Sequence, residues 1–369
     1  MGQGLKRDRA LELLGISRHQ YYYRSKPGGK GRKGTSSSPV MASGQELARC
    51  CNAEIVEKIK EIQMDRDTDY GYRKMTYYLR INGLMINHKK VYRLMKSAML
   101  LKTKKKGTDK QYVRYRIVMP EAPLQVFEMD IKQIWTVKER RHAFILTVID
   151  TFTRVVLHWS IGFHMKKEQV KAAWEDVILN HLQPADLLSK GVHVELRNDN
   201  GPQFGAKQIR EFFRENHIGQ VFTHPYTPQE NAHVESFHSI LNNAVGKNPY
   251  WSLEELENRL KTFYDAYNNR RIHASIAYLW PTLFWKLWDE GKITRVEKDK
   301  KKVKFTLNIP YHEISGNGSP REVSCSNLNP LDGGENLPNK EVNGLKPRNK
   351  PNTPNQTTSV QRSPSVVSC

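Results

Sequence analysis

Three carboxylates, far apart in the sequence, are the residues best suited to chemistry. Asp130 lies in FEMDI, between the apolar neighbours of a strand-like segment, where an acid is unfavourable unless it has a partner or a function. Asp199 lies in RNDNGPQF, in a loop after a strand-like segment, and Glu235 lies in HPYTPQENAHVESF, on a helix. Because carboxylate oxygens are the ligands that Mg²⁺ prefers, these residues are candidates for a metal-dependent catalytic site.

The segments that carry the two aspartates have the pattern of a mixed sheet. Residues 126–136, 142–150 and 153–162 are rich in β-branched and aromatic residues, and the short link at 151–154 predicts that the last two form a hairpin. Three strands followed by alternating helices and strands indicate an α/β fold with helices on the faces of the sheet. The later elements are predicted at 166–182 (helix), 193–197 (strand), 207–216 (helix) and 219–223 (strand).

A helix is predicted to begin at the segment 227–230, Thr-Pro-Gln-Glu, which reads as a capping box with proline at the first helical position. Glu235 lies at the edge of the stripe that this helix is expected to bury. A second capping box, at 252–255, predicts another helix. The buried stripe of the first helix is Val234, Phe237, Leu241 and Val245.

Other polar residues near these carboxylates have structural interpretations. Asp150 closes a strand before a turn, and we expect it to be structural. His224, His233 and His238 flank Glu235, but their spacing fits no common zinc pattern and no cysteine is near, so no zinc site is predicted.

Charge is distributed unevenly along the chain. The 369 residues carry a formal net charge of +21. Residues 1–120 hold 27 lysines and arginines but 10 aspartates and glutamates, an excess of 17, whereas residues 121–240 hold 13 and 15, a deficit of 2. A basic N-terminal part therefore precedes a nearly neutral part with room for a cluster of carboxylates, and the partner is expected to be a polyanion.

Two stretches of the basic part resemble helix-turn-helix units. Residues 7–24 hold a short one, with Ser17 as a helix N-cap. After a helix expected near 46–64, residues 71–100 hold a second, with a turn at Asn82-Gly83 and Asn87 as cap. Its last helix would place a basic face in a DNA major groove, although an ordinary solvated face gives the same periodicity. The candidate DNA contacts are Lys89, Lys90, Arg93 and Lys96, with Lys104, Lys105 and Lys106 in a basic connector.

These patterns predict seven segments. Hydrophobic residues make up 38% of the chain, and the last segment, poor in apolar residues and rich in Pro, Asn and Ser, is expected to be disordered. The segments are a partial helix-turn-helix (1–26), a flexible linker (27–44), a helical DNA-binding domain (45–100), a basic connector (101–120), a catalytic core with C-terminal helices (121–290), a basic extension (291–309) and a disordered tail (310–369).

Cellular location is constrained only weakly. The four cysteines, Cys50, Cys51, Cys325 and Cys369, suggest neither a disulfide framework nor a zinc site. The first residues lack the apolar run of a signal peptide, and no stretch is apolar enough to span a membrane. A reducing cytoplasm and a protein without membrane association are expected.

The three local strings, together with 35 residues between Asp199 and Glu235, resemble the Asp-Asp-Glu transposases and retroviral integrases. Within that superfamily the chain is most similar to the second-reading-frame, integrase-core transposases of bacterial insertion sequences. The similarity covers roughly residues 5–290 and includes GYRKMTYYLRINGLMINHKKVYRLM upstream and YNNRRIHASIAYLWP downstream.

This resemblance implies a ribonuclease-H-like core that cleaves and joins DNA strands at the ends of a mobile element. It also implies two Mg²⁺ or Mn²⁺ ions, with Asp130 contacting both, Asp199 one and Glu235 the other. Such ions activate the attacking oxygen and stabilise the leaving one. The implied partners are double-stranded DNA, further copies of the chain on that DNA, and a first-reading-frame helix-turn-helix protein. The implied location is the bacterial nucleoid.

One position departs from the family pattern. The glutamate-bearing helix usually carries Lys or Arg seven residues after the glutamate, to hold a DNA phosphate, and here that residue is Asn242. This leaves open a DNA-binding relative that has lost catalysis. A simple ribonuclease-H-type nuclease is a third hypothesis, but it does not explain the basic N-terminal part.

Overall fold

The computed structural model describes most of the chain up to residue 314. In the part described, no helix is long and apolar enough to cross a membrane. The described residues are 7–23, 34–42, 45–68, 70–102, 119–187, 189–224, 228–246, 248–299 and 302–314.

A five-stranded sheet forms the centre of the catalytic part. Its strands lie in the order β5-β4-β3-β6-β7. Neighbours among β3, β4 and β5 are antiparallel, whereas β6 runs parallel to β3 and β7 parallel to β6. This confirms the predicted mixed sheet, its hairpin and the ribonuclease-H-like fold. The strands are β3 (Val126–Thr136), β4 (Arg141–Asp150), β5 (Val156–Gly162), β6 (Val194–Asn198) and β7 (Ile218–Phe222).

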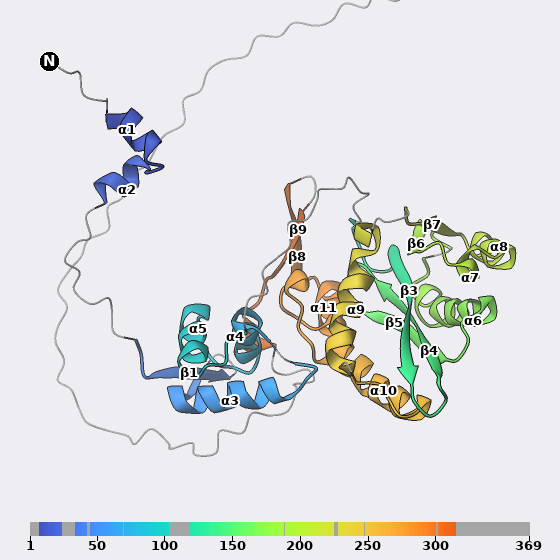
Figure 1. Cartoon of the computed structure of the whole chain (residues 1–369), viewed down its shortest axis with the longest axis horizontal. Coiled ribbons are helices and arrows are strands. Elements are labelled where there is room, and N and C mark those ends of the chain that lie inside the picture. The colour runs from blue at the N-terminus through green and yellow to red at the C-terminus, as the bar shows by residue number, and fades with distance from the viewer. Residues whose placement is uncertain are drawn as a thin grey trace, which may run out of the picture. The chain divides into compact units, whose positions relative to one another are not determined.

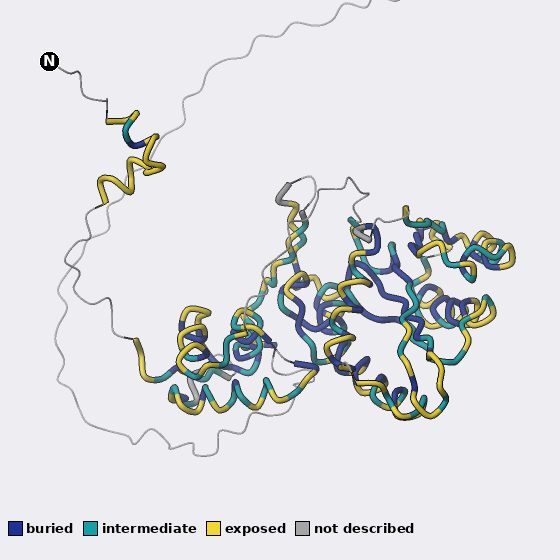
Figure 2. Tube along the Cα trace, viewed as in Figure 1, coloured by how far each residue is buried: buried dark blue, intermediate teal, exposed yellow. Residues whose placement is uncertain are grey.

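Helices cover both faces of the sheet, each over its own hydrophobic core (Figures 1 and 2). On one face, Trp174 and Phe213 pack with Phe127 of β3. On the other, Phe237 and Phe263 pack in a core that includes Ile145 of β4. The first layer holds α6 (Lys167–Val177), its π-helical continuation (Ile178–Leu182), α7 (Pro202–Gly205) and α8 (Lys207–Glu215), and the second holds α9 (Ala232–Val245) and α10 (Leu253–Asn269).

The N-terminal part contains the helices expected of the two helix-turn-helix-like units. Ser17 caps α2 through a reciprocal capping box with Gln20, and Asn87 caps α5 by accepting the N–H of Lys90. Both caps confirm the sequence prediction. The elements are α1 (Arg7–Leu13), α2 (Arg18–Tyr22), β1 (Ser37–Ala42), β2 (Gln45–Cys51), α3 (Asn52–Met64), α4 (Tyr72–Ile81) and α5 (His88–Ser97).

Two boundaries in this part differ from expectation. Part of the expected flexible linker, 27–44, is the strand β1, and α3 begins at Asn52 rather than near residue 46 because 45–51 form β2. The two strands pair antiparallel, and β1 also bonds to the turn after α4 through Met41 N–H to Gly83 O at 2.8 Å. Gly83 has φ +85°, and a Cβ there would lie 2.6 Å from Met41 O, so this turn requires glycine.

The described C-terminal residues belong to the folded structure. The remaining elements are α11 (Pro281–Asp289), the antiparallel hairpin of β8 (Ile293–Asp299) and β9 (Lys302–Leu307), and short 3₁₀ turns at Ala274–Ile276 and Tyr311–Glu313. The predicted start of the disordered tail, at residue 310, was placed too early. Tyr311 donates to Ala277 O at 2.7 Å and Ile314 is buried, because both belong to a hydrophobic core that also includes side chains from α4 and α11. The rest of that segment lies outside the described residues.

Candidate active site

Asp130 lies in β3, and Asp199 directly follows the end of the neighbouring strand β6. Glu128 pairs with Arg197 across the parallel β3–β6 ladder, and the same register carried two residues further places Asp130 beside Asp199. Asp130 accepts the N–H of Ile131 at 2.8 Å, and Asp199, after the end of β6, accepts the N–H of Gly201 at 3.0 Å. The parallel strands thus bring together two acids that are far apart in sequence.

Electrostatics also shows that the two aspartates are close. Desolvation raises the pKa of Asp199, the Gly201 hydrogen bond opposes that rise, and the negative charge of Asp130 adds to it. A cation beside Asp199 would stabilise its charged form, which the nearby negative charge destabilises. Their oxygens are hard donors, so the pair fits a divalent ion such as Mg²⁺.

Glu235 lies in the first turn of α9 and is exposed. Three residues later on the same helix, His238 is buried, with its Nδ1 3.3 Å from Asp130 Oδ2. Positions three apart lie on one face of a helix, so Glu235 is on the side of α9 that meets β3. The predicted buried stripe is confirmed: Val234, Phe237, Leu241 and Val245 are all buried.

The start of α9 differs from the predicted capping box. Residues Pro228–Asn231 form a 3₁₀ turn, and the α-helix begins at Ala232. Glu230 reaches back to accept the backbone N–H of His224 at 2.9 Å. Thr227, the expected cap of that box, lies outside the described residues. The N-cap residue, Asn231, makes no side-chain cap bond to the helix.

Glu128 supplies the missing cap, and sequence reasoning overlooked it. It is fully buried in β3, and its Oε2 accepts the N–H groups of His233 at 2.9 Å and Val234 at 2.8 Å. Burial raises its pKa to about 7, opposed first by the hydrogen bond from Val234. The signal was present in FEMD: an acid two residues before Asp130 lies on the same face of the strand.

The three acids are not gathered around one point. Within the described ranges, no group of three His, Cys, Asp or Glu side chains is arranged to hold a metal ion. The sheet brings Asp130 and Asp199 together, whereas Glu235 lies at the adjoining end of α9. Asp150 is buried and accepts the N–H groups of Leu124 at 3.1 Å and Thr153 at 2.8 Å, in agreement with its expected structural role.

The basic face of α5 needs one correction. Lys89, Arg93 and Lys96 are exposed, but Lys90 is buried, with its Nζ 2.7 Å from Ser37 O and also bonded to Thr35 and Ser38. Because Lys90 fastens α5 to β1, it is a structural residue rather than a DNA contact. Asn242 is exposed on α9. The candidates Lys104, Lys105 and Lys106 lie outside the described residues.

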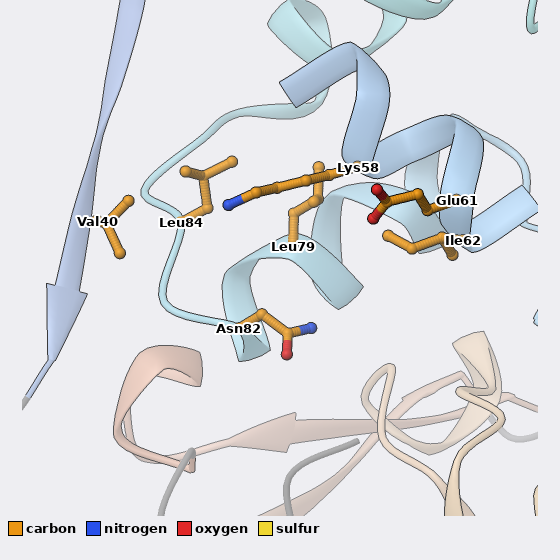
Figure 3. Close-up of a pocket in the computed structure, with 7 residues that line it drawn as sticks. All are labelled: Val40, Lys58, Glu61, Ile62, Leu79, Asn82 and Leu84. Carbon is orange, nitrogen blue, oxygen red and sulfur yellow. The ribbon is translucent and has the colours of Figure 1, made fainter. Parts of the chain in front are cut away.

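A small hollow in the N-terminal part offers no second site of this kind. It lies between β1, α3 and α4, and its lining is mainly aliphatic with a single acid, Glu61 (Figure 3). The lining residues are Val40, Lys58, Glu61, Ile62, Leu79, Asn82 and Leu84.

Comparison with known families matches these parts of the chain. Residues 120–228 and 216–281 each match an integrase core domain, and residues 51–107 match an HTH-like domain. The matches to integrase core domains together span residues 120–281. The integrase core holds the sheet, both aspartates and Glu235, and the HTH-like domain holds α3, α4 and α5. Together the two domains imply DNA binding and a polynucleotidyl transfer reaction.

Several proteins similar to this chain come from insertion elements. This chain is 25% identical over 284 residues to an uncharacterized 31.7 kDa protein of insertion element IS407 from Burkholderia multivorans, covering 75% of this chain and 89% of that protein. It is 26% identical to the putative transposase InsK of IS150 from Escherichia coli, covering 62% and 82%. A chain of a simian T-cell lymphotropic virus intasome aligns at 17% identity with a TM-score of 0.36, covering 58% and 69%.

Proposed function

We propose that this protein is an insertion-sequence transposase that cleaves DNA at the ends of its element and joins those ends to target DNA. The catalytic residues in this proposal are Asp130, Asp199 and Glu235. The observation that carries it is the placement of Asp130 on β3 and of Asp199 directly after the neighbouring parallel strand β6, with the glutamate-bearing helix packed against β3.

The reaction exchanges phosphodiester bonds. Attack by water on a phosphorus breaks its bond to a 3′-oxygen, which takes up a proton and leaves as a hydroxyl, while the water oxygen stays on the 5′-phosphate. Attack by that 3′-hydroxyl on a target phosphodiester forms one P–O bond and breaks another, so no external energy source is required. Both displacements are in line and need the attacking oxygen held behind the leaving oxygen.

The chain's own groups organise this exchange. Two divalent ions, Mg²⁺ or Mn²⁺, would lower the pKa of the attacking oxygen and neutralise charge on the leaving one. Asp130 would hold both ions, Asp199 one and Glu235 the other. His238 keeps the Asp130 carboxylate oriented toward the end of β6, and the exposed basic residues of α5 hold the DNA through its phosphates.

The test is strand joining by single variants of the full chain. Asp130→Asn, Asp199→Asn and Glu235→Gln should each lower the joining rate by about a thousandfold or more, because each removes a charge that acts on the transition state. DNA affinity measured without divalent ions should change less than about twofold, since the DNA-holding charge lies elsewhere. Glu257→Gln, on the exposed side of α10, is the matched control.

A joining rate near that of wild type in any one of the three variants would refute the site assignment. A wild-type protein that binds element ends but never joins them, with either Mg²⁺ or Mn²⁺, would favour the alternative of a DNA-binding relative that has lost catalysis.

A further inference from the structure

Two acids on one face of β3 both contact α9. Side chains alternate along a strand, so Glu128 and Asp130 point to the same face of the sheet. Glu128 Oε2 accepts the N–H groups of His233 and Val234, and Asp130 Oδ2 lies 3.3 Å from His238 Nδ1. The strand therefore meets the helix at its first turn and again about one turn later.

The contact from Glu128 caps the start of α9, which the helix's own N-cap residue does not do. The first N–H groups of any helix lack partners inside the helix and are usually capped by a nearby side chain. Asn231, the N-cap residue of α9, makes no side-chain cap bond. The cap comes instead from a strand 105 residues earlier in the chain, through a carboxylate that is fully buried. A buried acid with this geometry fixes where the helix starts relative to the strand.

We propose that Glu128 is a positioning residue for catalysis, which sets the register of α9 on β3 and so holds Glu235 at the height of Asp130. The inference rests on the proposed function. Glu235 directly follows Val234, whose N–H Glu128 holds, so little of the chain intervenes between the cap and the acid that it places. Slippage of α9 by one residue would turn Glu235 by about 100° around the helix axis.

The geometry distinguishes the effects of three substitutions. Both hydrogen bonds end on one oxygen, Oε2, so glutamine can keep both through its carbonyl oxygen. Aspartate is shorter by one methylene and would reach the helix only if α9 moved toward the sheet. Alanine removes the cap and leaves two N–H groups unpaired in a buried setting.

A matched control exists in the same sheet. Glu139, in the β3–β4 hairpin, accepts the N–H of Leu253, the first residue of α10. It is also a carboxylate that reaches from the sheet to the start of a helix, but that helix carries none of the three proposed catalytic acids. Glu139→Ala therefore reports the general cost of losing such a contact.

The experiment measures three quantities on the full chain: amide hydrogen exchange, the joining rate and its dependence on Mn²⁺ concentration, and DNA affinity without Mn²⁺. In Glu128→Ala, amides of 233–236 should exchange about tenfold faster, as expected for one lost cap. The joining rate should fall about a hundredfold, as for a catalytic group displaced by an ångström, and half-maximal rate should need several-fold more Mn²⁺. DNA affinity should stay within about twofold.

The other variants make the outcome decisive. Glu128→Gln should restore the joining rate to within about fivefold of wild type, Glu128→Asp should resemble alanine, and Glu139→Ala should speed exchange only at the start of α10. If Glu128→Ala does not fold, Glu128→Asp takes its place. Faster exchange at 233–236 with an unchanged rate and Mn²⁺ dependence would overturn the positioning role, and so would unchanged exchange. If wild type itself joins no DNA, the proposed function fails, whereas the exchange data still decide whether Glu128 caps α9.

Discussion

The two parts of the candidate site are held in different ways. One aspartate stands on β3 and the other directly after β6, and the backbones of these strands are joined by a parallel ladder from Val126 to Glu128. Glu235 stands on α9, which side-chain contacts place on the sheet: a buried apolar stripe, Glu128 at its start and His238 on Asp130. A ladder of backbone bonds resists single substitutions, whereas the exact position of a helix held by side chains can shift when one of them is lost. The aspartate pair should therefore be robust, and the position of the glutamate adjustable.

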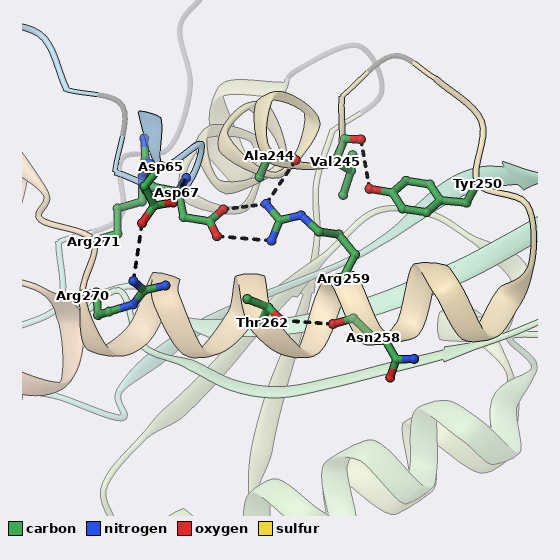
Figure 4. Close-up of polar contacts among 10 residues, drawn as sticks. All are labelled: Asp65, Asp67, Ala244, Val245, Tyr250, Asn258, Arg259, Thr262, Arg270 and Arg271. Carbon is green, nitrogen blue, oxygen red and sulfur yellow. Dashed lines mark hydrogen bonds and ion pairs between the residues drawn. The ribbon is translucent and has the colours of Figure 1, made fainter. Parts of the chain in front are cut away.

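The far end of α9 extends this contrast to the HTH-like domain. Arg259 of α10 donates to Ala244 O, near the end of α9, at 3.1 Å and forms a two-pronged ion pair with Asp67, at 2.7 and 3.2 Å (Figure 4). Asp67 lies between α3 and α4 and is buried. The helix that carries Glu235 is thus fastened at one end through a residue of the N-terminal part.

The largest effect on stability should come from a substitution in the core beneath the sheet that carries the two aspartates. Trp174 is fully buried and meets Phe127 and Phe213 edge to face. Trp174→Ala should lower the free energy of unfolding by about 3–5 kcal/mol, through lost burial and a cavity under β3. Urea unfolding measures this, with the exposed Trp251→Ala as control. A loss below about 1 kcal/mol would show that the sheet does not depend on this core.

Arg259→Ala should loosen only α9, the helix that carries Glu235. The unpaired Asp67 carboxylate and the lost bond to Ala244 O should cost about 2 kcal/mol. The joining rate should fall while DNA affinity is kept, and Arg259→Lys should rescue poorly because an ammonium lacks the two-pronged geometry. Lys261→Ala removes an exposed ion pair on the same helix and should cost less than about 0.5 kcal/mol. If Arg259→Ala and Lys261→Ala lower the joining rate equally, the Arg259 contacts do not position α9 for catalysis.

Within the HTH-like domain, two neighbouring lysines have different expected roles. Lys90 holds α5 on β1, whereas Lys89 is a candidate DNA contact. Lys90→Met should cost about 1–2 kcal/mol of stability, because it leaves the oxygens of Thr35, Ser37 and Ser38 without their donor, and should not change the salt dependence of DNA binding. Lys89→Met should do the reverse, reducing the slope of log K against log salt by about one unit. Denaturant unfolding and titrations at several salt concentrations test both, and a slope change in Lys90→Met would contradict its assignment as a structural residue.

The smallest effect should come from the outer surface of α9. Asn242 is exposed, so Asn242→Lys should leave the helix and the carboxylates in place. If this surface faces DNA, the new charge should steepen the salt slope by about one unit on element ends, with or without Mg²⁺. Ser239→Lys, also exposed and one turn away, is the companion variant. Unchanged slopes in both variants would mean that this face of α9 lies away from DNA.

The sequence predicted what depends on local pattern. The apolar runs of β3, β4 and β5 and the caps at Ser17 and Asn87 appear where expected, because periodicity and cap chemistry act over a few residues. The strand β1 was missed, since its Ser-rich start resembles a linker and it is stabilised by contacts that no local pattern reveals: pairing with β2, a bond to the turn after α4 and the Lys90 side chain. Glu128 was overlooked and Lys90 was misjudged for the same reason. The string FEMD shows that Glu128 shares a strand face with Asp130, but the partners, His233 at 105 residues and Ser37 at 53 residues, are too distant for a local pattern to report.

The hydrophobic core of the N-terminal part also bears on the order of folding during synthesis. Its buried side chains come from Cys50 to Ile314, whereas the buried side chains of the core between β3 and α6 come from Leu124 to Ile218, with Phe222 and Trp285 packed against them. During synthesis from the N-terminus, the second core can close as soon as Ile218 has left the ribosome, whereas the first must wait for Ile314. The HTH-like domain precedes the sheet in the chain, yet its core is expected to be completed later.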